Sequence, residues 1–247
     1  MMRSGVSEGP HLVLLPGHMC DERLFAPQIS DLTRACATIQ APPLLGGDSV
    51  SALASEVLKA APRRFALAGL SMGGIVAFEM LRQQPERITH LALIDTNARP
   101  ETPDRQVTRQ RDMAAVRAGR LLEVTLAGKS AYLGPDHAES AELRGLLAKM
   151  SEALGEEAFQ VQAEALLTRP DSRPGLRLLD SRRPTLILAG REDRLCPPAM
   201  QFEMADLIPH ADLVLLGRCG HLSTLERAKD VSAELARLLN RSSEILH

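Results

Sequence analysis

The chain has 247 residues, of which 45% are hydrophobic and 24% charged, and its formal net charge at pH 7 is −2. A charge so close to neutral gives no electrostatic reason to expect binding to nucleic acid or to a membrane surface. The single tyrosine, five phenylalanines and absence of tryptophan also argue against the aromatic platforms on which nucleic-acid bases stack.

Short apolar runs alternate with amphipathic segments along most of the chain. Uninterrupted apolar runs are typical of strands buried on both faces, and helical segments between them predict a parallel α/β sheet covered on both sides. We therefore expect about six mostly parallel strands. The expected strands are His11–Leu15, 37–41, 65–68, Ile88–Ile94, 185–189 and 213–216, with helices at 49–61 and 74–83.

The alternation stops between residues 99 and 183. This stretch contains no run typical of a strand, and its segments have helical spacing, separated by glycine and proline. Four helices are expected there: 104–118, 121–126, 138–153 and 156–168. The sequence thus predicts a core domain made of residues 1–98 and 184–247, interrupted by an all-helical insertion over residues 99–183.

Residues 69–73 read Gly-Leu-Ser-Met-Gly, which is a G-x-S-x-G motif, and Gly74 follows. The pentapeptide alone is weak evidence, but a predicted strand precedes it and a predicted helix follows it, as the motif requires. The glycines permit a tight turn that lifts the serine hydroxyl clear of the sheet. Ser71 is therefore the predicted nucleophile.

A serine hydroxyl needs a base to accept its proton. His221 follows the last predicted strand, and the chain order Ser, Asp, His matches the arrangement that accompanies this motif. Asp193 follows the strand 185–189 and is the predicted acid that orients the imidazole. Two alternatives remain open, because Asp95 also ends a strand and Glu192 is adjacent to Asp193.

Two backbone N–H groups are expected to stabilise the developing oxyanion. One belongs to the residue after the nucleophile, Met72, and the other to the loop after the first strand, where His18 lies. The imidazole of His18 is not needed for this role, and either contacts the substrate or simply lines the loop.

In these four motifs the chain resembles the α/β-hydrolase superfamily over nearly its whole length. The helical insertion is similar to the V-shaped lid of small bacterial carboxylesterases, including the pimeloyl-carrier-protein methyl ester esterases. The resemblance implies an α/β-hydrolase fold and a serine hydrolase that cleaves a small carboxylic ester through an acyl-enzyme intermediate. Alternatives with the same triad are a lactonase, a thioesterase and a carbon–carbon bond hydrolase or lyase. A binding protein that has lost catalysis is a further alternative.

Several departures from the family pattern narrow these possibilities. Pro16 occupies a position that is usually histidine, and the absence of an H-G-G-G run disfavours the lipase-like group. A serine nucleophile argues against haloalkane dehalogenase and epoxide hydrolase chemistry, and Leu70 in place of asparagine argues against the carbon–carbon hydrolases. The chain starts just before the strand His11–Leu15, so the usual first two antiparallel strands are expected to be absent.

The remaining expectations concern partners, cofactors and location. No phosphate loop, dinucleotide motif or metal-ligand spacing is present, so no cofactor or metal is expected. The first ten residues lack the apolar core of a signal peptide, and a cytoplasmic monomer or homodimer acting on a small-molecule ester is expected. Arginines of the insertion either attract an acidic acyl carrier protein or an anionic substrate, or pair with Asp104, Asp112 and Glu123. These arginines are Arg99, Arg105, Arg109, Arg111, Arg117 and Arg120.

Overall fold

Six parallel strands form one sheet at the centre of the protein in the computed structural model, which describes residues 9–243. The strand order is β2-β1-β3-β4-β5-β6, and every neighbouring pair is parallel. The predicted six-stranded parallel sheet is thus confirmed. The strands are β1 (His11–Leu15), β2 (Thr38–Gln40), β3 (Phe65–Leu70), β4 (Ile88–Ile94), β5 (Thr185–Gly190) and β6 (Asp212–Leu216).

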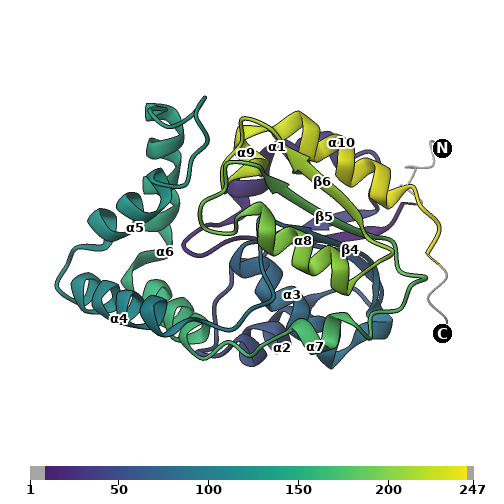
Figure 1. Cartoon of the computed structure of the whole chain (residues 1–247), viewed down its shortest axis with the longest axis horizontal. Coiled ribbons are helices and arrows are strands. Elements are labelled where there is room, and N and C mark those ends of the chain that lie inside the picture. The colour runs from purple at the N-terminus through teal and green to yellow at the C-terminus, as the bar shows by residue number, and fades with distance from the viewer. Residues whose placement is uncertain (1–8, 244–247) are drawn as a thin grey trace, which may run out of the picture.

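Helices cover both faces of this sheet (Figure 1). The face that carries α2, α3, α7 and α8 is opposite the face that carries α1, α9 and α10. Short 3-10 helices, η1 (Glu22–Phe25) and η2 (Pro85–Arg87), precede α1 and β4. The core helices are α1 (Ala26–Leu32), α2 (Val50–Ala60), α3 (Met72–Gln83), α7 (Arg173–Leu176), α8 (Pro198–Leu207), α9 (Ser223–Glu226) and α10 (Ala228–Leu239).

Side chains on each strand alternate between the two helix layers. In β1, Val13 and Leu15 pack with α2 and α3, whereas Leu12 and Leu14 pack with α1 and α10. Because both faces are covered, both sets of side chains are apolar, which explains the uninterrupted apolar runs in the sequence. Within residues 9–243 no helix is both long and apolar enough to cross a lipid bilayer.

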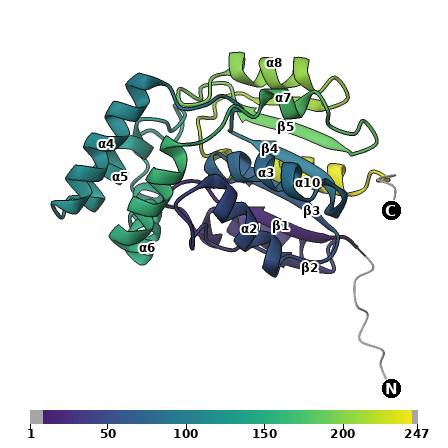
Figure 2. The ribbon, with the colours of Figure 1, turned by 90° about the horizontal axis from the view of Figure 1, so that it is seen from below.

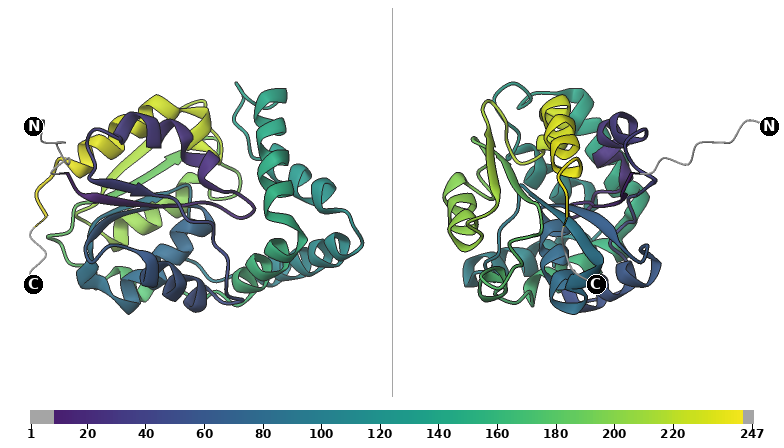
Figure 3. Two further views of the ribbon diagram at one scale, coloured as in Figure 1. Left: turned by 180° about the vertical axis from the view of Figure 1, so that it is seen from behind. Right: turned by 90° about the vertical axis from the view of Figure 1, so that its right-hand side faces the viewer.

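Between β4 and α7 the chain leaves the sheet and forms three helices, α4 (Pro103–Arg117), α5 (Leu121–Ser130) and α6 (Ala141–Leu167). We call these three helices and the turns between them the helical insertion. They lie together beyond the carboxyl ends of the strands (Figures 1 and 3). Gly155 interrupts α6 with a φ of 79° and a ψ of −177°, so α6 contains both of the helices expected at 138–153 and 156–168.

Two helical segments were not expected from the sequence. Helix α1 has seven residues and buries only Gln28 and Leu32, so its apolar periodicity is too weak to recognise. Helix α7 has four residues and lies beside α8 in the view from below (Figure 2).

Candidate active site

Ser71 occupies a sharp turn between β3 and α3. Its φ of 53° and ψ of −113° fall in a region that non-glycine residues rarely adopt, at a cost of about 1–3 kcal/mol. Its N–H donates to the Ile94 carbonyl at 2.9 Å, which holds the turn against β4. Helix α3 also approaches β1 closely: a Cβ on Gly73 would lie 2.0 Å from the Leu15 carbonyl oxygen. Glycine is therefore required there for the turn to form.

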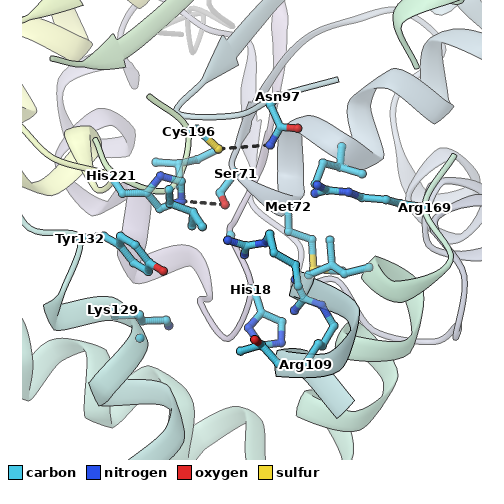
Figure 4. A pocket seen from close by; sticks show the side chains of 18 of the residues that line it. His18, Ser71, Met72, Asn97, Arg109, Lys129, Tyr132, Arg169, Cys196 and His221 are labelled. Carbon is cyan, nitrogen blue, oxygen red and sulfur yellow. Dashed lines mark hydrogen bonds between the residues drawn. The ribbon is translucent and has the colours of Figure 1, made fainter. Parts of the chain in front are cut away.

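A chain of hydrogen bonds connects Ser71, His221 and Asp193 (Figure 4 shows the Ser71–His221 bond). Nδ1–H of His221 donates to Asp193 Oδ2 at 2.8 Å, so its Nε2 accepts from the Ser71 hydroxyl at 2.9 Å. The other carboxylate oxygen of Asp193 accepts from the N–H groups of Leu195 and Cys196, at 2.8 and 2.9 Å. The structure thus brings the three predicted residues together in the predicted order.

The electrostatic environment keeps His221 basic. Burial disfavours its charged form, but the negative charges of Asp193 and, more weakly, Asp95 outweigh burial and raise the pKa of His221 above its ordinary value of 6.5. The geometry and the charge together suit a group that accepts a proton from a neighbouring hydroxyl.

Neither alternative acid takes the place of Asp193. The two oxygens of Asp95 accept from the N–H groups of Gly190 and Ser223, each at 3.0 Å. Burial and the charge of Asp193 raise the pKa of Asp95 to about 7. Glu192 is exposed, and it accepts from the Cys219 N–H at 2.8 Å. Both residues hold the backbone of the loops around His221.

His18 and Met72 line the same cavity as Ser71 (Figure 4). Met72 is the first residue of α3, where the N–H groups have no partner within the helix. The imidazole of His18 packs edge-on against Phe159, with ring centroids 4.9 Å apart. Burial, assisted by the charges of Arg109 and Lys129, holds the pKa of His18 well below 6.5. The imidazole is therefore a neutral part of the cavity wall.

Hydrogen bonds join the loop that carries His18 to the helical insertion, and the sequence did not predict them. The N–H of Met19, a residue with a φ of 52°, donates to Gln162 Oε1 at 2.8 Å. The amide group of Gln162 also donates to the Leu44 carbonyl at 3.0 Å, and Lys129 donates to the Met19 carbonyl. Gln162 shares a helix face with Ala158, Phe159 and Leu166. A single polar residue on an apolar helix face is the sequence signal that could have indicated a buried hydrogen bond here.

The loop that carries His221 is also joined to the insertion. The His221 N–H donates to the Tyr132 carbonyl at 2.8 Å. The buried carboxylate of Glu226 accepts from the N–H groups of Gly134, Gly220 and Leu222, at 2.7 to 3.2 Å. Glu226 had no sequence signal, because Gly134 is distant along the chain and the bonds to nearby Gly220 and Leu222 depend on how the histidine loop folds.

The cavity above Ser71 has a volume of about 420 Å³, a size typical of sites for small ligands. The insertion and the chain segments on either side of it supply much of the cavity wall. The apolar side chains that they contribute include Val124, Phe159 and Leu166. Its wall carries one acidic side chain, Asp112, among the residues that the structure describes. Five basic side chains also line it: Arg99, Arg105, Arg109, Lys129 and Arg169.

The arginines predicted on the insertion separate into two groups. On its outer surface, Arg111 lies 3.7 Å from Asp112 and Arg120 lies 3.5 Å from Glu123, as one of the two sequence interpretations expected. Arg105 and Arg109 instead turn inward and pair with Glu101, a residue that was not singled out from the sequence. Arg99 pairs with Glu203 of α8 at 2.8 Å.

One group of potential metal ligands occurs within residues 9–243: Asp193, Cys196 and His221. Their chemistry does not suit a metal ion. The sulfur of Cys196 already accepts from the Asn97 amide at 3.3 Å. The carboxylate of Asp193 and the imidazole of His221 already bind each other.

Comparison with known proteins identifies the family. The chain matches the model of the alpha/beta hydrolase family over residues 5–234. It is 32% identical over 257 residues to the pimeloyl-(acyl-carrier protein) methyl ester esterase of Xanthomonas oryzae pv. oryzae (strain MAFF 311018), covering 95% of this chain and 96% of that protein.

Solved structures agree with this assignment. A malate-bound thermophilic esterase from Thermogutta terrifontis is 26% identical, with a TM-score of 0.81 over 94% of this chain and 89% of that one. The enol-lactonase of Burkholderia xenovorans LB400 shares the fold at 23% identity, with a TM-score of 0.84 over 97% and 94% of the two chains. The chain belongs to the alpha/beta hydrolase family and is a hydrolase that acts on ester bonds.

Proposed function

We propose that this protein cleaves a small carboxylic ester by acyl transfer to Ser71, with His221 as general base and Asp193 as the residue that orients it. The observation that carries the proposal is the continuous set of hydrogen bonds from Asp193 through His221 to Ser71 at the floor of the cavity. A serine hydroxyl in this setting loses its proton to the imidazole as it attacks.

In the first half of the reaction, Ser71 Oγ forms a bond to the ester carbonyl carbon while its proton moves to His221 Nε2. The N–H groups of Met72 and His18 stabilise the negative charge that develops on the carbonyl oxygen. Asp193 stabilises the imidazolium without accepting its proton. The tetrahedral intermediate then breaks its bond to the alcohol oxygen, which takes the proton from His221 and leaves as an alcohol.

In the second half, a water molecule attacks the acyl-enzyme and gives a proton to His221. The tetrahedral intermediate breaks its bond to Ser71 Oγ, which recovers the proton from the imidazole, and the carboxylic acid is released. His221 thus acts as base and then as acid in each half of the cycle.

The helical insertion supplies the lid of this site. The support is its position beyond the carboxyl ends of the strands, together with its contribution to the cavity wall (Figures 1 and 4). In this proposal, residues 1–98 and 184–247 form the catalytic core domain, and the insertion 99–183 contains the lid that selects what reaches Ser71, although its last helix, α7, packs on the core.

Hydrolysis of p-nitrophenyl esters of increasing acyl length tests the proposal. We expect a maximum at one chain length, and we expect Ser71→Ala to lower kcat by about 10⁴-fold or more. A fluorophosphonate should label the wild-type protein and leave Ser71→Ala unlabelled. Hydrolysis by Ser71→Ala at the wild-type rate would overturn the proposal. Lactones and thioesters on the same panel distinguish the alternative acyl-transfer substrates.

A carrier-linked ester is a second candidate substrate. The relative from Xanthomonas oryzae named above is a pimeloyl-(acyl-carrier protein) methyl ester esterase, and the outer surface of the insertion carries exposed Arg111 and Arg120. If this surface attracts an acidic carrier protein, the ester on that carrier should be hydrolysed with a kcat/KM that falls steeply as salt is added. A kcat/KM that does not depend on salt would exclude this electrostatic recruitment.

A further inference from the structure

A cluster of three arginines around one carboxylate lies in the cavity wall. Glu101, whose side chain is fully buried, accepts from Arg105 at 3.1 Å, from Arg109 at 2.6 Å and from Arg169 at 3.4 Å. Arg105 and Arg109 come from the start of the insertion, and Arg169 comes from just after its end. Three guanidinium groups share one carboxylate, so the cluster has an excess of positive charge.

Arg169 is the least satisfied member of the cluster. Its side chain is only 9% exposed, and its Nε–H has no hydrogen-bond partner among the described residues. Burial lowers its pKa, and the attraction of Glu101 does not fully offset this. A buried cation with an unused donor gains free energy when an anion reaches it.

The three arginines line the same cavity as Ser71. The positive charge of Arg105 acts on His221 by lowering its pKa, and that of Arg109 acts in the same way on His18. In Figure 4, Arg169 lies on the opposite side of the cavity from His221. The excess charge is therefore directed at whatever occupies the cavity.

Tying the two ends of the insertion together is a sufficient role for part of this cluster. That role needs one arginine from each end, and Arg109 and Arg169 meet it through Glu101. It accounts neither for the second arginine from the same end nor for the unused Nε–H of Arg169.

We propose that Arg105, Arg109 and Arg169 bind a carboxylate group of the substrate, so that the preferred substrates are half-esters of short dicarboxylic acids. A planar guanidinium matches a carboxylate with two parallel hydrogen bonds, and this cluster already binds the carboxylate of Glu101. The substrate class rests on the ester hydrolysis proposed above, whereas the anion site itself does not.

Paired substrates test the proposal on the wild-type protein. Monomethyl esters of the dicarboxylic acids from succinate to suberate are compared with the matching methyl esters that end in a neutral primary amide. We expect the acid of the best length to exceed its amide partner in kcat/KM by about 10- to 100-fold, the range for a hydrogen-bonded charged group. Equal rates for every pair, or faster cleavage of the amides, would overturn the proposal.

Variants identify the residues that produce this preference. Arg169→Gln should reduce the acid-to-amide ratio about 10-fold or more, and Arg109→Gln should reduce it in the same direction. Arg117→Gln is the matched control, because Arg117 is an exposed arginine of α4 that does not line the cavity. It removes the same charge from the insertion and should leave the ratio unchanged. Equal reductions in Arg117→Gln and Arg169→Gln would contradict a specific site.

Binding of monomethyl glutarate and the other half-esters to Ser71→Ala, measured by calorimetry, separates this inference from the proposed function. Binding that Arg169→Gln weakens, in a protein whose wild-type form hydrolyses no ester, supports the anion site and overturns the esterase. Ser71-dependent hydrolysis of p-nitrophenyl esters without binding of any half-ester supports the esterase and overturns the anion site.

Discussion

The two walls of the cavity are built in different ways. At the edge of the sheet, Ser71, His221 and Asp193 have short or rigid side chains, and hydrogen bonds hold each of them. On the insertion, the long side chain of Arg105 is 44% exposed and shares Glu101 with two other arginines. The wall at the sheet edge suits a chemical step that needs fixed distances, and the wall formed by the insertion suits recognition, which tolerates adjustment.

Replacing Asp193, the acid that orients His221, tests the wall at the sheet edge and should have the largest effect on kcat. In Asp193→Asn, we expect kcat to fall by about 10⁴-fold, because an amide that donates to Nδ1 stabilises the wrong tautomer of His221. Steady-state kinetics with a p-nitrophenyl ester measure the loss.

Glu192→Gln is the matched control, since Glu192 is the adjacent carboxylate and binds the Cys219 N–H instead. It should change kcat by less than about 10-fold. If Asp193→Asn kept wild-type turnover and Asp95→Asn lost it, the orienting acid would be Asp95.

Gln162 tests whether the two walls are independent. Gln162→Ala leaves the buried N–H of Met19 without a partner and releases the loop of His18. We expect kcat to fall by about 10- to 100-fold with little change in KM, because a donor to the oxyanion is misplaced. Gln160→Ala is the control and should retain wild-type kcat, because Gln160 lies on α6 like Gln162 but donates to the Met113 carbonyl of α4. Equal losses in both variants would indicate a general effect on α6.

The pH dependence of hydrolysis reports the protonation of His221 in the wall at the sheet edge. His221 must be neutral to accept a proton, so kcat/KM should fall as the pH is lowered through its pKa. Burial alone would bring that pKa below 6.5, but Asp193 and Asp95 raise it, and the midpoint should lie above 6.5. A midpoint below 6.5, measured with an uncharged ester, would contradict the assigned environment.

The smallest expected effect is that of a charge on the insertion on the pKa of His221 at the sheet edge. The positive charge of Arg105 lowers the pKa of His221, so Arg105→Gln should move the midpoint of the same pH profile to higher pH. Arg117→Gln lies outside the cavity and should leave the midpoint in place. No shift in Arg105→Gln would show that solvent screens the insertion from the triad.

Residues near the ends of strands were predictable from the sequence, because the edge of a parallel sheet gathers them. The motif around Ser71, the position of His221 and the oxyanion loop all follow from this rule. The choice between Asp193 and Asp95 was harder, since both follow strands at the same edge. The answer depends on which carboxylate accepts hydrogen bonds from the backbone of the neighbouring loops. Asp95 accepts from the N–H groups of Gly190 and Ser223, which leaves Asp193 to bind His221.

Residues of the insertion were much less predictable. Helical periodicity located its helices, but their orientation depends on contacts between segments far apart in the sequence. Gln162 lies 143 residues from Met19, and Glu226 lies 92 residues from Gly134. Glu101 was overlooked because its three partners meet only when the two ends of the insertion come together.

The bonds from Tyr132 and Gly134 to the histidine loop also bear on how this scaffold can be altered. The loop is completed by the backbone of the insertion, through the Tyr132 carbonyl and the Gly134 N–H. A chimera that exchanges the insertion for that of another family member must therefore reproduce a turn with this backbone geometry. Grafts designed around side chains alone would leave the His221 N–H without its partner and would remove the Gly134 N–H, one of the three donors to Glu226, so they would misalign the base. The transplantable unit is the helices together with the turn at residues 132–134.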